Sequence, residues 1–214
     1  MKLGTLMNWN RSAAVSLVIG TLAGFITMAF HPTGADVVAN AAAGGRNVLA
    51  VAMHLLALCG LPFVLAGLLG FTVRLRRRDL AVLGYAFYVL GAIGAMIAAV
   101  ASGLIAPEAA QFVTAGGMSV LRYTRLINQS FALIYAVLTA IALVTWSAAL
   151  LLGRDGYTRL AISGLVVGPL LLIVVVSGLL PLNVHGFGVV VAAQGIWCLS
   201  VASLLWGISS APRA

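Results

Sequence analysis

Three histidines, His31, His54 and His185, are the residues of this sequence best suited to ligate a metal ion or to carry a proton. His54 falls in the apolar stretch 49–71, where it is the only ionisable side chain apart from the thiol of Cys59. Three imidazoles around an ion with an open fourth position form a hydrolytic zinc site. One alternative is therefore a zinc-dependent membrane hydrolase acting on a lipid or an amide.

Sequence support for this metal site is sparse. The chain has no HExxH motif, no pair of histidines at helical spacing, and no obvious carboxylate to orient a ligating imidazole. A haem held between two histidines is disfavoured, because His54 alone is well inside an apolar stretch. The sequence therefore predicts no resident cofactor and leaves zinc as the metal to test.

Basic and amide side chains ahead of the fourth apolar stretch suggest a different site. If a helix extends outward from Ser119, then Arg122, Arg125 and Gln129 share one face at positions i, i+3 and i+7. Such a stripe suits a phosphate or carboxylate head group. Two alternatives remain: the arginines extend to lipid head groups, or one of them pairs with Glu108.

We expect the ligand-binding residues to gather where several helices end on the same side of the membrane. For His54 the alternative is a neutral imidazole that is hydrogen-bonded to a neighbouring helix. The full set of candidate ligand-binding residues is His54, Glu108, Arg122, Arg125, Asn128, Gln129 and Gln194.

Composition places these residues in an integral membrane protein. Of the 214 residues, 63% are hydrophobic and only 7% are charged, whereas soluble domains carry about 25% charged residues. Long continuous apolar stretches predict helices, because a helix satisfies its own backbone hydrogen bonds in lipid. The net charge of +8 is better explained by membrane topology than by nucleic-acid binding.

About 20 apolar residues cross a membrane once, and the chain contains six such stretches. We therefore predict a single all-α domain, residues 1–214, with six transmembrane helices. The predicted spans are 12–31, 49–72, 80–106, 127–152, 160–181 and 186–208.

The basic residues predict the orientation of these spans. Nine of the 12 fall on the side that holds both termini, and three fall on the other side. Positive residues favour the cytoplasmic side, so we expect cytoplasmic termini in a bacterial inner membrane. The nine are Lys2, Arg11, Arg74, Arg76, Arg77, Arg78, Arg154, Arg159 and Arg213, and the three are Arg46, Arg122 and Arg125.

Prolines at regular intervals suggest an internal repeat of three helical hairpins. Pro32, Pro107 and Pro181 follow the odd-numbered spans at similar intervals. The next span in each pair carries a polar residue near its beginning: His54, Gln129 or Gln194. The alternative is that proline ends membrane helices for ordinary reasons in a sequence of low complexity.

The span centres contain no Asp, Glu, Lys or Arg, which argues against an ion-coupled transporter or a voltage sensor. We expect a non-enzymatic function: a small or lipidic ligand is bound or passed at an outward-facing polar vestibule, or the chain serves as a membrane subunit. Expected partners are membrane lipids and either a protein partner or a second copy, but no nucleic acid.

Overall fold

The computed structural model of the protein is a bundle of α-helices and describes residues 3–112 and 117–210. Within these residues, six helices are long and apolar enough to cross a membrane. The spans are Trp9–Ala29, Val48–Thr72, Arg78–Ala110, Ser119–Gly153, Thr158–Val176 and Val184–Gly207. The prediction of a helical multi-pass membrane protein with six spans is confirmed.

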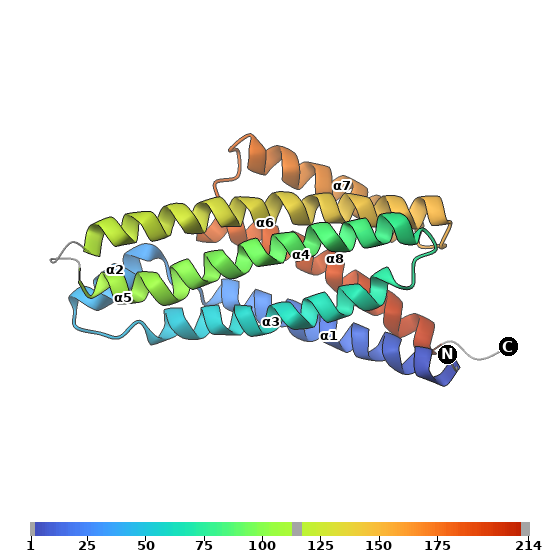
Figure 1. The fold of residues 1–214 in the computed structure, drawn as a ribbon, viewed down its shortest axis with the longest axis horizontal. Coiled ribbons are helices and arrows are strands. Elements are labelled where there is room, and N and C mark those ends of the chain that lie inside the picture. Colours follow the sequence, from blue (N-terminus) through green and yellow to red (C-terminus); the bar gives the residue numbers. More distant parts are fainter. Residues whose placement is uncertain (1–2, 113–116, 211–214) are drawn as a thin grey trace.

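Figure 1 shows the spanning helices running along one long axis, with the start of α1 and the end of α8 at the same end. We call this the terminal end and the other the opposite end. The helices are α1 (Leu3–Ala29), α3 (Val48–Thr72), α4 (Arg78–Val100), α6 (Gly117–Gly153), α7 (Thr158–Val176) and α8 (Val184–Ser210). A π-helical turn, η1 (Ala101–Ile105), and α5 (Ala106–Ala110) continue α4, and α2 (Gly34–Ala42) is a short helix after α1.

The spanning helices pack as two sets of three. Helix α1 packs along α3 and α8, whereas α6 packs along α4 and α7. Small residues let helices approach within a set: a Cβ on Gly20 would collide with Val64 of α3, and one on Gly91 would collide with Thr139 of α6. Contacts between the two sets are sparser, which leaves room for a cleft between them.

The fourth spanning helix begins earlier than the predicted start at residue 127. Helix α6 starts at Gly117 and thus includes Arg122 and Arg125. The polar segment 117–126 lacks the hydropathy of a membrane span, but its backbone is still best satisfied by helical hydrogen bonds. The helix therefore extends far enough outward for Arg122, Arg125 and Gln129 to share one face.

Two predicted span ends are wrong. The third span does not stop at residue 106 but continues to Ala110, with Pro107 in the first turn of α5. Pro107 directly follows the π-helical turn, and such local adjustments allow membrane helices to tolerate proline. The fifth span ends at Val176 and not at Pro181, because Gly178 takes a left-handed conformation with φ of 75° just beyond the helix.

The first connection at the opposite end contains α2, which the sequence analysis did not predict because the helix is too short for a membrane span. Thr33 and Asp36 form a capping box at its start, with 2.7 Å from the Thr33 nitrogen to an Asp36 carboxylate oxygen. Hydrogen bonds from the Thr33 side chain and backbone hold the pKa of Asp36 below its ordinary value. Asp36 therefore stabilises a local turn.

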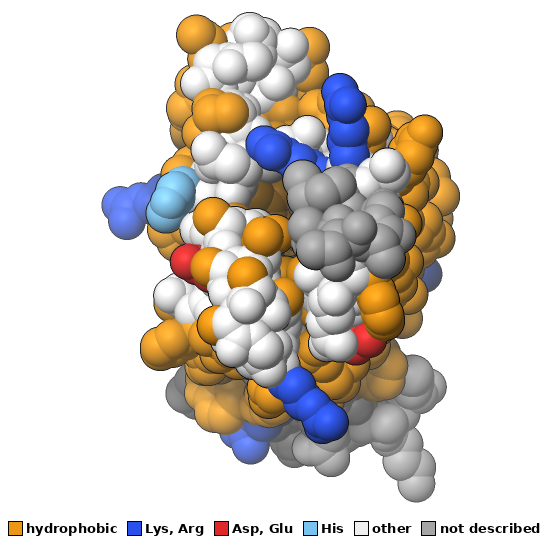
Figure 2. Space-filling view, turned by 90° about the vertical axis from the view of Figure 1, so that its left-hand side faces the viewer, with side chains coloured by type: hydrophobic (Ala, Val, Ile, Leu, Met, Phe, Trp, Pro, Cys, Tyr) orange, Lys and Arg blue, Asp and Glu red, His pale blue; other side chains and the backbone are white. Residues whose placement is uncertain are grey.

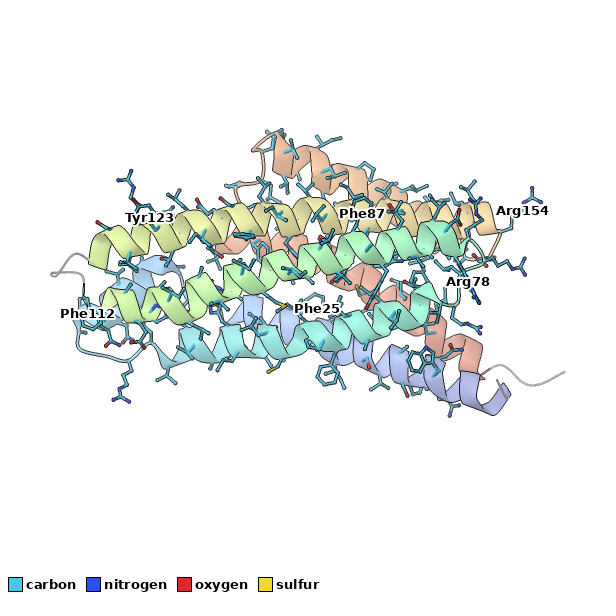
Figure 3. All side chains as sticks on the ribbon, viewed as in Figure 1. Phe25, Arg78, Phe87, Phe112, Tyr123 and Arg154 are labelled. Carbon is cyan, nitrogen blue, oxygen red and sulfur yellow. The ribbon has the colours of Figure 1, made fainter. Side chains whose placement is uncertain are left out.

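Basic side chains are concentrated at the terminal end of the bundle. Arg78 and Arg154 lie at the terminal end, whereas Phe112 and Tyr123 lie near the opposite end (Figure 3). Two of the nine basic residues predicted at the terminal end, Lys2 and Arg213, lie outside the described residues. The others are Arg11, Arg74, Arg76, Arg77, Arg78, Arg154 and Arg159, which belong to the first turns of α1, to the connections at this end and to the helix starts beside them.

The three predicted hairpins do not pack alike. The pairs α1 with α3 and α4 with α6 are closely packed, but α7 and α8 meet over a short stretch. Helix α7 instead packs on α6, and α8 packs on α1. The internal repeat therefore stays a prediction from the sequence.

Candidate ligand-binding cleft

A cavity of about 950 Å³ lies between the two sets of helices. Helices α1, α3, α4, α6 and α8 form its walls, and α2 and the connections after α1 and α7 contribute to its mouth. Along α6 the lining extends from Ser119 to Tyr135, which is roughly 24 Å at the rise of an α-helix. The part of this length that lies beyond the polar segment 117–126 is roughly 12 Å, less than half of the ~30 Å hydrocarbon thickness of a bilayer.

An aromatic cluster in the terminal half of the bundle forms the floor of this cleft. Trp146 is fully buried and stacks on Trp197 at 5.8 Å between ring centroids. Phe71 and Tyr88 complete the cluster, and Tyr88 also lines the cavity. Trp146 Nε1 donates to the carbonyl of Ala81 at 3.1 Å, so the polar atom of this ring is satisfied within the core. The cavity lining therefore reaches this cluster at Tyr88, whose ring packs against Trp146.

His54 lies in the cleft wall on α3, with 4% of its surface exposed. Its Nδ1 lies 2.7 Å from the carbonyl oxygen of Ala50, one helical turn earlier. Its Nε2 lies 2.8 Å from Oγ of Ser102 in the π-helical turn η1. Gly103 makes this approach feasible, because a Cβ at that position would collide with Cβ and Cγ of His54. A π-helical turn is often found at a functional site.

His31 meets His54 from the connection after α1. The two Nε2 atoms are 3.0 Å apart, and the rings are edge to face with centroids separated by 4.6 Å. Nδ1 of His31 lies 2.8 Å from the carbonyl oxygen of Pro32. Burial lowers the pKa of His31 below its ordinary value, and the Pro32 carbonyl partly opposes this effect. We call His31, His54 and Ser102 the histidine pair site.

The third histidine does not join this site. His185 lies on the first turn of α8, where it is exposed and contributes to the cavity lining. Across residues 3–112 and 117–210, no group of three or more His, Cys, Asp or Glu side chains is arranged to hold a metal ion. The geometry thus brings two of the three predicted metal ligands together and leaves the third apart.

Helix α6 presents its polar face to the cleft. Arg122, Arg125, Asn128 and Gln129 all line the cavity, and the two arginines are exposed near its mouth. Thr124, on the same stretch, satisfies its hydroxyl within the helix by donating to the carbonyl of Leu121 at 2.9 Å. The arginine and amide side chains are therefore the polar groups of α6 that a ligand can reach.

Gln194 is buried in the cleft wall on α8 and already has partners. Its Oε1 accepts a hydrogen bond from the Tyr135 hydroxyl at 2.7 Å, and its amide nitrogen donates to Thr139. Thr139 in turn donates to the backbone carbonyl of Tyr135 at 2.6 Å. This network joins α6 to α8 across the two helix sets, so Gln194 shapes the cleft.

Glu108 stays outside the cleft. Its side chain is exposed on α5, and it does not contribute to the cavity lining. In the part of the chain that the structure describes, Glu108 forms no ion pair with Arg122 or Arg125. The ion pair that the sequence left open is therefore not formed.

The cleft lining carries basic groups without acidic ones among the described residues. Its ionisable side chains are His31, His54, Arg122, Arg125, His185, Tyr88, Tyr135 and Cys198. Figure 2 looks onto the opposite end and shows Lys and Arg side chains standing out from it, with acidic side chains towards the edges. Apart from these groups the lining is dominated by Ala, Gly, Val and Leu.

Two polar residues of the site were missed by sequence reasoning: Ser102 and Thr139. Ser102 is inconspicuous in a run of small residues, and the sequence gives no sign of the π-helical turn that carries it. Tyr135 and Thr139 are one helical turn apart on α6, opposite Gln194. A search for polar residues at this spacing in the apolar spans would have found the pair.

Comparisons with known proteins add no relative from which a function can be transferred. The chain matches no protein-family model, and neither a curated protein nor a solved structure is significantly similar to it.

Proposed function

We propose that this protein binds an amphiphile with an anionic head group in the cleft, its apolar chain inserted between the two helix sets. The observation that carries this proposal is the lining: an apolar cavity of about 950 Å³ with five Arg or His side chains and no acidic residue among those described. Ligand pockets in proteins commonly have volumes of ~300–1,000 Å³ with a few polar groups that fix the ligand's orientation.

The distribution of these groups supports an orientation for the ligand. Arg122 and Arg125 stand near the mouth, and their guanidinium groups suit carboxylate or phosphate oxygens. Farther along the cleft, down to Tyr88 and Cys198, the walls consist mostly of small apolar residues, and the polar groups of Gln194 and Tyr135 are paired with each other. The apolar chain of the ligand would find in this part of the cleft an environment similar to lipid. Its head group would stay at the mouth.

The aromatic floor favours binding over passage. Trp146 and Trp197 close the terminal half with stacked rings, and both are almost completely buried. A ligand that enters from the opposite end would have to displace this cluster to cross the bundle. We therefore propose a carrier, sensor or scaffold that holds its ligand within one half of the membrane.

Filling the cleft tests the proposal. In Gly24→Trp the new ring would project towards the cavity, because a Cβ on Gly24 would meet only Val191, at 3.6 Å. We expect at least a severalfold loss of photocrosslinking to a diazirine-labelled fatty acid in nanodiscs. The matched control is Leu22→Trp on the lipid-facing side of the same helix, where 47% of the leucine is exposed. Equal labelling of both variants and the wild type would contradict cleft binding.

We further propose that both termini are cytoplasmic and that the cleft opens on the outer side of the bacterial inner membrane. The excess of basic residues at the terminal end supports this orientation. After replacement of Cys59 and Cys198 by alanine, a membrane-impermeant maleimide should label Ala43→Cys on intact cells. Thr158→Cys should react only after permeabilisation, and the reverse pattern would place the cleft on the cytoplasmic side.

A further inference from the structure

The histidine pair site has one hydrogen-bond contact that two neutral imidazoles cannot make. Carbonyl oxygens only accept, so the contacts to Ala50 and Pro32 place a hydrogen on Nδ1 of both His54 and His31. A neutral imidazole carries one N–H, and both Nε2 atoms would then present lone pairs. Yet these two Nε2 atoms face each other at 3.0 Å, the distance of an ordinary hydrogen bond.

Ser102 does not remove this conflict. Its Oγ lies 2.8 Å from Nε2 of His54 and 2.8 Å from the carbonyl oxygen of Ala98. A hydroxyl has one hydrogen, so if it donates to Ala98 it can only accept from His54. One added proton, on Nε2 of His54 or of His31, supplies the hydrogen that the contact between the two Nε2 atoms lacks.

We propose that the histidine pair takes up one proton from water when the anionic ligand enters the cleft, so that ligand binding and protonation are coupled. This inference rests on the proposed function, and it assigns the regulation of that same cleft. The protonated pair shares a single positive charge between two rings in the cavity wall, where the ligand supplies the opposite charge.

The surroundings of the pair explain why the ligand is needed. His54 is 4% exposed, and burial disfavours an ion that lacks a counter-ion. The described residues of the lining include no carboxylate that could balance the positive charge of a protonated imidazole. Arg122 and Arg125 on α6 add positive charge, and the imidazole of His185 on α8 also lines the cavity. The hydroxyls of Tyr88 on α4 and Tyr135 on α6 and the thiol of Cys198 on α8 are neutral at ordinary pH.

The sign of the coupling follows from this balance. The anion raises the proton affinity of the pair, so binding takes up a proton wherever the pH lies between the pKa of the free pair and that of the liganded pair. In that interval the affinity strengthens by about tenfold for each pH unit of acidification. Above and below the interval the affinity is independent of pH.

The experiment uses dodecyl sulfonate as the probe, because a sulfonate stays ionised and any pH dependence must come from the protein. Calorimetric titration of the full chain in nanodiscs, with empty nanodiscs as the blank, gives the dissociation constant at each pH. Repetition in buffers of different ionisation enthalpy gives the protons taken up. We expect about one proton per ligand in the coupled interval, and dodecanol, which is neutral, should bind without proton uptake.

Variants separate the pair from the rest of the cleft. His31 lies in the connection after α1, outside the spanning helices. His31→Gln removes one of the two facing Nε2 atoms and should reduce proton uptake to near zero, with sulfonate still bound. His54→Gln should do the same, but His31→Gln carries the test if the buried variant does not fold. Arg46→Gln, at an exposed position outside the cavity lining, should keep the wild-type uptake.

The outcomes separate this inference from the proposed function. Sulfonate binding without proton uptake, or with equal uptake in wild type and His31→Gln, would overturn the coupling and leave amphiphile binding in place. If neither sulfonate nor dodecanol binds, the proposed function itself fails. Stoichiometric zinc that disappears in His31→Gln would also overturn the inference, because a metal ion would then occupy the place of the proton.

Discussion

Trp146→Ala is expected to lower the free energy of unfolding by about 4 kcal/mol, the range of large-to-small substitutions of buried aromatic residues. Trp146 is 0% exposed and contacts the rings of Phe71, Tyr88 and Trp197. In a membrane the loss comes from packing more than from water exclusion, because lipid is as apolar as the core. The variant also leaves the Ala81 carbonyl without its indole donor.

Unfolding in mixed micelles with increasing SDS would measure this loss. The matched control is Trp206→Ala, in which a half-exposed ring that stacks near Arg11 at 5.9 Å is removed. A cation–π contact at an exposed position contributes ~0.5–1 kcal/mol, so the control should lose far less stability. Similar losses in the two variants would show that the aromatic cluster is not the stable floor of the cleft.

Gly103→Ala is expected to cost about 2–3 kcal/mol, the upper range for overpacking. The added Cβ would collide with Cβ of His54 as well as Cγ, and rotation of the imidazole cannot relieve a clash at Cβ. Helix α3 and the π-helical turn must therefore separate, which breaks the 2.8 Å contact between Ser102 and His54. Loss of this contact should also reduce the pH dependence of ligand binding.

Thermal unfolding of Gly103→Ala in nanodiscs would test this expectation, with Gly24→Ala as the matched control. There a Cβ meets only Val191, at an ordinary 3.6 Å, and alanine is the better helix former by about 1 kcal/mol. The control should be neutral or slightly stabilised. If Gly103→Ala were equally stable, the close approach of His54 to η1 would be wrong, and the histidine pair site with it.

The sequence predicted most of the transmembrane architecture because membrane insertion depends on composition over about 20 residues. It predicted six spans, and its errors fell at their ends, as with Pro107 and Pro181. Proline and glycine end a helix only when the local backbone geometry requires it, and hydropathy does not report that geometry.

The candidate site was predictable in part. The face shared by Arg122, Arg125 and Gln129 follows from the spacing of the residues along one helix. The pairing of His31 with His54 does not, because 23 residues and a change of chain direction separate them. Ser102 is 48 residues from His54 and reaches it only because a π-helical turn and Gly103 let the two helices approach.

By itself, then, the sequence determined that the chain is a helical membrane protein with its basic residues unevenly distributed, since hydropathy and charge act locally along the chain. Tertiary structure decided which helices pair, that two sets of three leave a cleft between them, and that two of the three histidines meet there. The physical reason is that helix association in lipid depends on close packing at small residues such as Gly20, Gly91 and Gly103. Such packing depends on which helix faces each glycine, and only the folded bundle specifies that.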